Sequence, residues 1–164
     1  MLRNEFLRAS INGSAGLTQL VYSNATFAIS GDSFSVELKG SSLAPGSGLT
    51  FVSAVRAQSS VNLTYTMPGG KLTATAEYTL EPGWRVISKQ LHLEGQTLAL
   101  NNLHLLGQAG VNLTATSTRA DGTQATCTFA SDYGKPESLN HAAAFHRCKA
   151  ATDSAVGLMV SVAN

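Results

Sequence analysis

Residues 71 to 80 show the clearest alternation of apolar and polar positions in the chain. A period of two predicts a β-strand with one buried face and one exposed face. On a helix the same apolar residues would spread around the whole circumference, so a helix is excluded here. The side chains expected on the buried face are Leu72, Ala74, Ala76, Tyr78 and Leu80.

A turn follows this strand at Glu81-Pro82-Gly83. Proline followed by glycine is typical of a type II turn, whose third position needs a positive φ. Tight two-residue hairpins prefer the mirror-image turns, so we expect a slightly longer loop at this point. The sequence therefore predicts a β-hairpin whose second strand ends near Gly95.

The second strand of this hairpin has conflicting parity. Trp84 and Val86 lie on one parity, whereas the later apolar residues, such as Leu91, lie on the other. Two interpretations remain open: a β-bulge at residues 87–88, or an inward-pointing Lys89 beside Leu91. We favour the bulge, because an unpaired buried ammonium group costs several kcal/mol.

The same alternation recurs along the rest of the chain and predicts an all-β fold, an antiparallel β-sandwich in one domain spanning residues 1–164. Residues 61–129 are interpreted as successive antiparallel strands at short spacing, and residues 40–48 as an exposed loop. At most one short helix is expected, near residues 137–150. The predicted strand segments are 4–11, 17–22, 34–38, 61–67, 72–80, 84–93, 98–106, 111–116, 125–129 and 155–164.

Composition supports a β protein and excludes two classes of partner. Only 13% of the 164 residues are charged, about half the usual share, and Ser and Thr supply the polar surface. A net charge of +1 provides no basic surface for nucleic acid. No apolar run approaches the roughly 20 residues that a membrane-spanning helix needs. The amino terminus as given has charges but no apolar core of a signal peptide, so for a secreted protein we expect the signal to have been removed or to lie outside this sequence. The last apolar position lies close to Asn164, which is compatible with a natural end or with a fragment of a longer chain.

Cysteine usage and sequons point to a secretory or extracellular setting. Cys127 and Cys148 are the only cysteines and are expected to form one disulfide, which would stabilise the fold by roughly 3 kcal/mol. Four N-x-S/T sequons exceed the number expected by chance in so Thr-rich a chain. The glycosylation candidates are Asn12, Asn24, Asn62 and Asn112.

No set of residues with a catalytic or metal-binding spacing is visible, so we expect no cofactor and name no catalytic residue. Glycine motifs for nucleotides and a hydrolase elbow are both missing. The acidic residues, including Asp32, mostly lie in turns or on exposed strand faces, and no carboxylate pair is recognisable. His141, His146 and the two cysteines resemble zinc ligands, but without C-x2-C or H-x3-H spacing the disulfide is preferred. Whether the chain is an enzyme stays open.

The amino-terminal sequence, residues 2–9 followed by 16–20, resembles the start of galactose-mutarotase-like β-sandwich domains: an asparagine, a short strand, a glycine turn and a return strand. Residues 76–80, Trp84-Arg85-Val86 and Lys89 are similar to the long central hairpin of those domains. In glycoside hydrolases such a domain commonly precedes a catalytic barrel and sometimes lends a loop to the sugar site. The His and Glu of a mutarotase cannot be located, so the resemblance implies no catalytic residue in this chain.

The expected function is therefore a non-catalytic β-sandwich portion of a secreted carbohydrate-active enzyme that contributes to glycan binding. Its expected partners are a carbohydrate and a catalytic domain in the same protein. The alternatives are an independent glycan-binding or adhesion module, and a structural β domain that assembles through an edge strand. Sugar platforms use exposed aromatic and polar side chains, and the glycan-contact candidates are Trp84, Tyr133 and Asp132, although Trp84 also suits hairpin packing.

Overall fold

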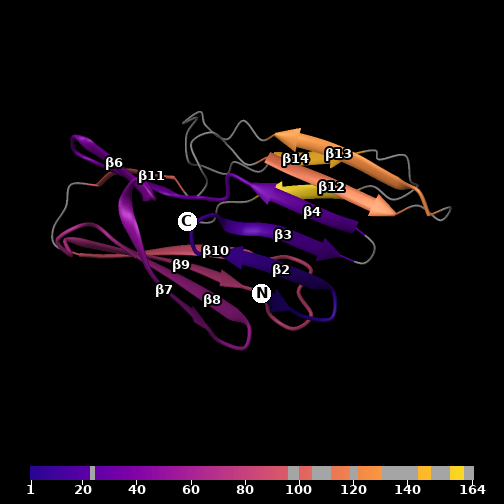
Figure 1. Cartoon of the computed structure of the whole chain (residues 1–164), viewed down its shortest axis with the longest axis horizontal. Coiled ribbons are helices and arrows are strands. Elements are labelled where there is room, and N and C mark those ends of the chain that lie inside the picture. The colour runs from indigo at the N-terminus through magenta and orange to yellow at the C-terminus, as the bar shows by residue number, and fades with distance from the viewer. Residues whose placement is uncertain are drawn as a thin grey trace.

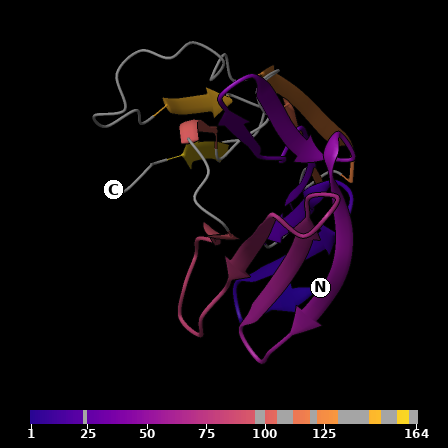
Figure 2. The ribbon, with the colours of Figure 1, turned by 90° about the vertical axis from the view of Figure 1, so that its left-hand side faces the viewer.

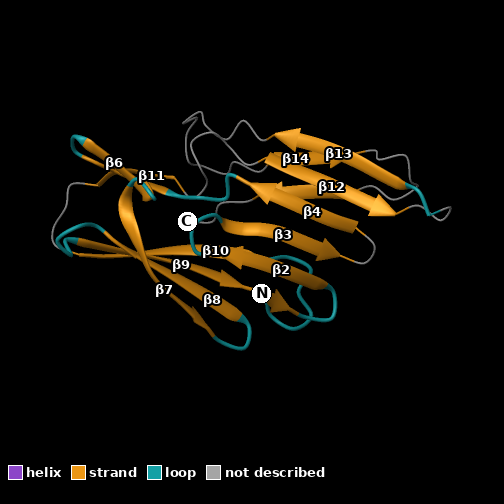
Figure 3. Ribbon diagram, in the orientation of Figure 1, coloured by secondary structure: helices purple, strands orange, loops and turns teal. Residues whose placement is uncertain are grey.

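The structure, a computed structural model, describes residues 1–22, 25–95, 100–104, 112–118, 122–130, 144–148 and 156–160. Every regular element in this part of the chain is a β-strand, as Figure 3 shows, so the predicted all-β class is confirmed. Each predicted strand segment overlaps a strand of the structure.

The first sheet contains the amino-terminal strands and two strands from the second half of the chain, and neighbouring strands in it are antiparallel (Figure 1). In spatial order its strands are β1 (Leu2–Arg3), β2 (Leu7–Asn12), β3 (Gly16–Tyr22), β4 (Ala25–Ser30), β12 (Asn112–Thr118) and β13 (Gln124–Ala130).

The second sheet is antiparallel except for a short parallel pairing between β6 and β7. In spatial order its strands are β10 (Ser88–Gly95), β9 (Leu72–Thr79), β8 (Ser60–Thr66), β7 (Gly48–Arg56), β6 (Ser41–Pro45), β5 (Ser35–Leu38) and β11 (Leu100–His104). A separate antiparallel pair consists of β14 (Ala144–Cys148) and β15 (Val156–Val160).

One hydrophobic core joins the two large sheets, and the N-terminal strands lie against the β7–β9 strands in the rotated view of Figure 2. The alternation along β8 and β9 explains what these two strands of the second sheet contribute to the core, because every second residue in them is buried. The first sheet contributes Leu2, Leu7, Ala9, Leu17 and Ile29, and the second contributes Val36, Leu43, Leu49, Val61, Leu63, Tyr65, Leu72, Ala74, Ala76 and Tyr78.

The predicted hairpin is confirmed as β9 and β10, joined by a loop at residues 80–87. The backbone N–H of Trp84 donates to the carbonyl of Glu81 at 3.1 Å, and Gly83 has φ of 81°. Proline at the second position and a left-handed glycine at the third make this the expected type II turn.

The favoured bulge in β10 is wrong. The pairing of β10 with β9 runs without a register shift from Ser88 to Gly95, and Lys89 lies opposite the buried Tyr78. Residues directly opposite each other share a face of the sheet, so Lys89 points into the core. The ammonium is tolerated there because it is paired, as described below.

Three further expectations need correction. Residues 40–48 are not simply a loop, because they contain β6, whose Leu43 is buried. The expected helix at residues 137–150 is wrong where the structure describes this segment, since Ala144–Cys148 is strand β14. The strands of residues 61–129 do not all pair with their sequence neighbours, because β11 pairs with β5 and β12 with β4.

Candidate functional site

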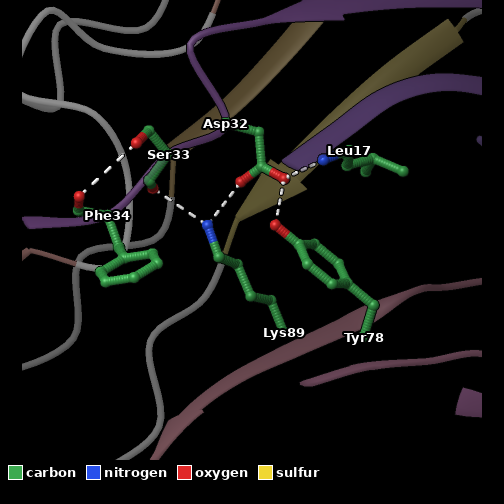
Figure 4. Close-up of polar contacts among 6 residues, drawn as sticks. All are labelled: Leu17, Asp32, Ser33, Phe34, Tyr78 and Lys89. Atoms are coloured by element: carbon green, nitrogen blue, oxygen red, sulfur yellow. Dashed lines mark hydrogen bonds and ion pairs between the residues drawn. The ribbon is translucent and has the colours of Figure 1, made fainter. Parts of the chain in front are cut away.

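Asp32 lies in the segment that carries the chain from β4 in the first sheet to β5 in the second, and it is only 5% exposed. Its Oδ2 accepts a hydrogen bond from the backbone N–H of Leu17 at 2.7 Å and another from the Tyr78 hydroxyl at 2.9 Å. Figure 4 shows both groups pointing at one carboxylate oxygen. One aspartate therefore connects β3 of the first sheet with β9 of the second.

Lys89 completes this buried cluster from β10. Its Nζ lies 2.7 Å from Oδ1 of Asp32 and donates to the carbonyl of Ser33 at 2.9 Å (Figure 4). The ammonium also lies 5.6 Å from the centre of the Tyr78 ring. With 13% of its side chain exposed, the lysine is nearly removed from water, and the carboxylate and carbonyl replace its hydration.

Burial changes the proton affinity of the groups around Asp32. Desolvation lowers the pKa of Lys89, and the charge of Asp32 acts in the opposite direction. Desolvation raises the pKa of Tyr78, which also rises because its hydroxyl donates to the Asp32 carboxylate. Burial, with a smaller contribution from Asp32, raises the pKa of Tyr65 to about 12. Tyrosine ionisation is therefore disfavoured throughout the core.

Gly16, the first residue of β3, lies in close contact with Asp32 and Tyr78 of the cluster. It has φ of 68°, and a Cβ built on it would meet the backbone oxygen of Asp32 and lie 2.6 Å from the Tyr78 hydroxyl. Only glycine fits at this position, both for its φ and for its close approach to Asp32. Asp32 and Tyr78 are buried and hydrogen-bonded within the protein, so the chemistry of the cluster is that of a satisfied ion pair that ties the sheets together.

A second group of side chains gathers on the surface, where Asn4 holds the loop of residues 80–87. Its Nδ2 donates to the carbonyls of Glu81 at 2.7 Å and Trp84 at 2.8 Å. Its Oδ1 accepts from the backbone N–H groups of Phe6 at 2.9 Å and Leu7 at 2.8 Å. The four bonds fix the orientation of this amide and attach the hairpin loop to the amino-terminal segment.

Arg85 and Trp84 project from the loop that Asn4 holds. The guanidinium of Arg85 stacks over the Phe6 ring, 4.3 Å from its centroid, and its Nη1 donates to the Tyr22 hydroxyl at 3.1 Å. Trp84 is 40% exposed and Tyr22 is similarly exposed. The carboxylate of Glu5 accepts from the N–H of Gly83 at 2.8 Å. We call Asn4, Glu5, Tyr22, Trp84 and Arg85 the loop platform.

An open pocket of about 330 Å³ adjoins this platform. The residues that line it are Arg3, Asn4, Glu5, Phe6, Leu7, Arg8 and Val21. Hydrogen-bonding groups and aromatic side chains are thus present on the same exposed part of the molecule. This combination suits a ligand that has both apolar faces and hydroxyl groups.

The predicted glycan contacts are only partly placed by the structure. Trp84 is exposed on the loop platform, whereas Tyr133 and Asp132 lie outside the described residues. Neither Asn4 nor Arg85 was predicted to be a contact residue. Asn4 follows Leu2 by two residues and is followed by the polar Glu5. Asparagine at such a place indicates a turn, but this signal is not specific to a contact residue.

The sequons and cysteines are also only partly placed. Asn12 is exposed at the end of β2, and Asn62 lies within β8. Asn24 lies outside the described residues, and of Asn112 only its place on β12 is described. Cys127 lies on β13 and Cys148 on β14, and no disulfide is found in the described part of the chain. The pairing of the two cysteines stays a prediction.

Within the described ranges, no group of three or more His, Cys, Asp or Glu side chains is arranged to hold a metal ion. The structure describes no helix that is long and apolar enough to cross a membrane. No protein-family model, curated protein or solved structure matches this chain.

Proposed function

We propose that this chain is a non-catalytic β-sandwich portion of a secreted carbohydrate-active enzyme and that it binds glycan through the loop platform. The observation that carries the proposal is that Trp84 is exposed on the loop that also carries Arg85 and that Asn4 holds in place. Aromatic faces pack against the C–H faces of sugar rings, while amide, guanidinium and carboxylate groups bind the hydroxyls.

The geometry favours binding over catalysis. The buried pair of Asp32 and Lys89 is engaged within the protein, and the platform holds one carboxylate, that of Glu5, which already accepts from Gly83. Glycoside cleavage needs two carboxyl groups several Å apart. We therefore propose that it supports a catalytic domain in the same protein, and we expect the reading frame that encodes this segment to continue into one.

Binding can be measured through the chain's only tryptophan, because Trp84 reports on the platform directly. A glycan array identifies a bound sugar class, and titration of the strongest hit then gives a dissociation constant from tryptophan emission. Arg85→Ala is expected to weaken binding about tenfold, the equivalent of roughly 1.4 kcal/mol. Phe51→Leu, at an exposed aromatic position on β7, is the matched control and is expected to bind normally.

A second variant tests the role of the loop by changing the residue that holds it in place. Asn4→Asp keeps the two acceptor bonds to Phe6 and Leu7 but places a carboxylate against the carbonyls of Glu81 and Trp84. We expect weaker glycan binding, a changed tryptophan emission and a lower melting temperature, because two hydrogen bonds that attach the loop are lost. An array without a hit above background, or unchanged binding by Arg85→Ala, would contradict the proposal.

A further inference from the structure

β7 forms an open edge of the second sheet over most of its length. On one side it pairs with β8 from Thr50 to Arg56. On the other side β6 pairs only with its first two residues, Gly48 and Leu49. No described strand continues that pairing, so the segment from Thr50 to Arg56 presents backbone hydrogen-bonding groups along one edge.

Apolar side chains are exposed along the same edge. Val55 is 61% exposed, and Phe51 and Val52 are exposed as well. A register shift between Phe51 and Ser53 makes Val52 the extra residue of a β-bulge. Exposed apolar residues that gather on one strand mark an interaction surface more often than scattered ones do.

The edge of β7 has a bulge at Val52, but it lacks charged residues and proline over most of its length. From Gly48 to Val55 it contains no charged residue and no proline, and Arg56 is its only charge. Natural edge strands are commonly protected by lysine, proline, inward charges or bulges, and β7 has only the bulge. The opposite edge of the same sheet, β10, does carry charged side chains, including Lys89 and Glu94. Only one of these two edges is therefore suited to pairing.

A pocket of about 330 Å³ lies at the start of this edge. Its lining includes Pro45, Leu49, Phe51, Tyr65 and Pro68, and its exposed surface is mainly apolar. The Phe51 ring packs edge-on against Tyr65, with centroids 5.7 Å apart, which holds one wall in place. The pocket offers room for an apolar side chain that accompanies an added strand.

We infer that β7 is a self-association surface and that its partner is β7 of a second copy of this chain. A two-fold axis perpendicular to the sheet places an edge strand antiparallel to its own copy. In that arrangement the two Arg56 side chains fall at opposite ends of the paired strands, so their charges do not meet. The joined sheets cover the apolar side chains of both edges, and the net charge of +1 adds little repulsion.

The inference is tested by the oligomeric state of the whole chain. Sedimentation velocity should show a monomer–dimer equilibrium with a dissociation constant on the order of 10 µM, as expected for a small interface. Val55→Lys places a charge on the edge and should leave the protein monomeric at tenfold higher concentration. Val86→Lys is the matched control, because Val86 is 59% exposed but lies in the loop before β10, and it should dimerise normally.

Amide hydrogen exchange provides a second readout that does not depend on a variant. Exchange from Thr50 to Arg56 should slow as the protein concentration rises through the dissociation constant, while the glycine turn at Gly69 should be unaffected. Circular dichroism confirms that each variant is folded. A wild-type monomer at all concentrations, assemblies larger than a dimer, or a Val55→Lys variant that still dimerises would overturn the inference.

Discussion

The ammonium of Lys89 and the carboxylate of Asp32 lie 2.7 Å apart in the core, although the two residues are 57 positions apart in the sequence. Asp32 lies on the link between β4 and β5, and Lys89 lies on the edge strand β10. Each supplies the charge that makes burial of the other acceptable. The pair therefore fixes where the connecting segment crosses the second sheet.

Removing either charge should be strongly destabilising. Lys89→Met leaves the Asp32 carboxylate buried without its cation, and Asp32→Asn leaves the ammonium without its anion, so each should cost about 3–5 kcal/mol of unfolding free energy. The double variant should lose clearly less than the sum, with a coupling of at least about 2 kcal/mol in urea denaturation.

A control pair for this double-mutant cycle lies on the opposite face of the same hairpin. His92 Nε2 and Glu77 Oε2 are 3.4 Å apart, with the histidine largely exposed. A cycle of His92→Gln and Glu77→Gln should give a coupling below about 1 kcal/mol, as for surface pairs in general. Equal coupling energies for the two pairs would contradict the importance of the buried one.

Gly16→Ala should destabilise the protein by more than about 3 kcal/mol. The added Cβ must displace the backbone of Asp32, which cannot move without breaking the cluster. Gly70→Ala is a close control, since Gly70 has φ of 69° and nothing within 4 Å of the added carbon. It should cost only about 1 kcal/mol, from backbone strain alone. Similar melting temperatures for the two variants would contradict the close packing at Gly16.

Stability should fall steeply above pH 10. The pKa of Tyr65 rises from 10.0 to about 12 in the folded protein, and that of Tyr78 is raised as well. Between the unfolded and folded values the native state keeps protons that the unfolded chain loses, so the unfolding free energy decreases with pH. Each tyrosine contributes about 1.4 kcal/mol per pH unit in this range.

Lys89 acts in the opposite direction, because its lowered pKa lets the native state lose a proton first. This contribution raises stability with pH only up to 10.5, where the unfolded lysine also deprotonates. Urea denaturation at pH values from 9 to 12 measures the net effect. Tyr65→Phe should reduce the slope above pH 10.5 by about half, and an unchanged slope would argue against burial of its hydroxyl.

Among the described sequons, Asn12 should carry glycan and Asn62 should not when the chain passes through a secretory pathway. Asn12 is exposed next to the β2–β3 turn, with its Oδ1 accepting from the N–H and hydroxyl of Ser14, both at 2.8 Å. Asn62 lies between β7 and β9, and its Oδ1 is buried. Site occupancy measured by glycopeptide mass spectrometry tests this difference, and higher occupancy at Asn62 would reverse the assignment.

The sequence predicts strands well where one face of the sheet is buried and the other is wet. β8 and β9 alternate almost perfectly, because both are central strands packed on one core. β7 was missed, since an edge strand exposed along most of its length gains nothing from alternation. Pairings between distant strands, such as β12 with β4, depend on tertiary packing that no local pattern encodes.

The buried charges were harder to predict than the strands. Asp32 follows Gly31 in what reads as an ordinary surface turn, and only the three-dimensional path shows that this turn crosses the core. Lys89 could be noticed in the sequence, because it shares the parity and the face of Leu91 and Leu93, where an apolar residue is expected. The parity conflict identified the position, but its resolution required a partner from elsewhere in the chain. The loop platform likewise depends on Asn4 reaching a hairpin that lies 77 residues later in the sequence.

The contact between Asp32 and Lys89 also constrains how the gene can change. A neutral replacement at either position leaves the other charge buried without its partner, and a second replacement at that position removes this destabilisation. Substitutions at the two codons should therefore occur together in descendants of this sequence. Gly16 belongs to the same linked set, because any larger residue there would require the aspartate to give way.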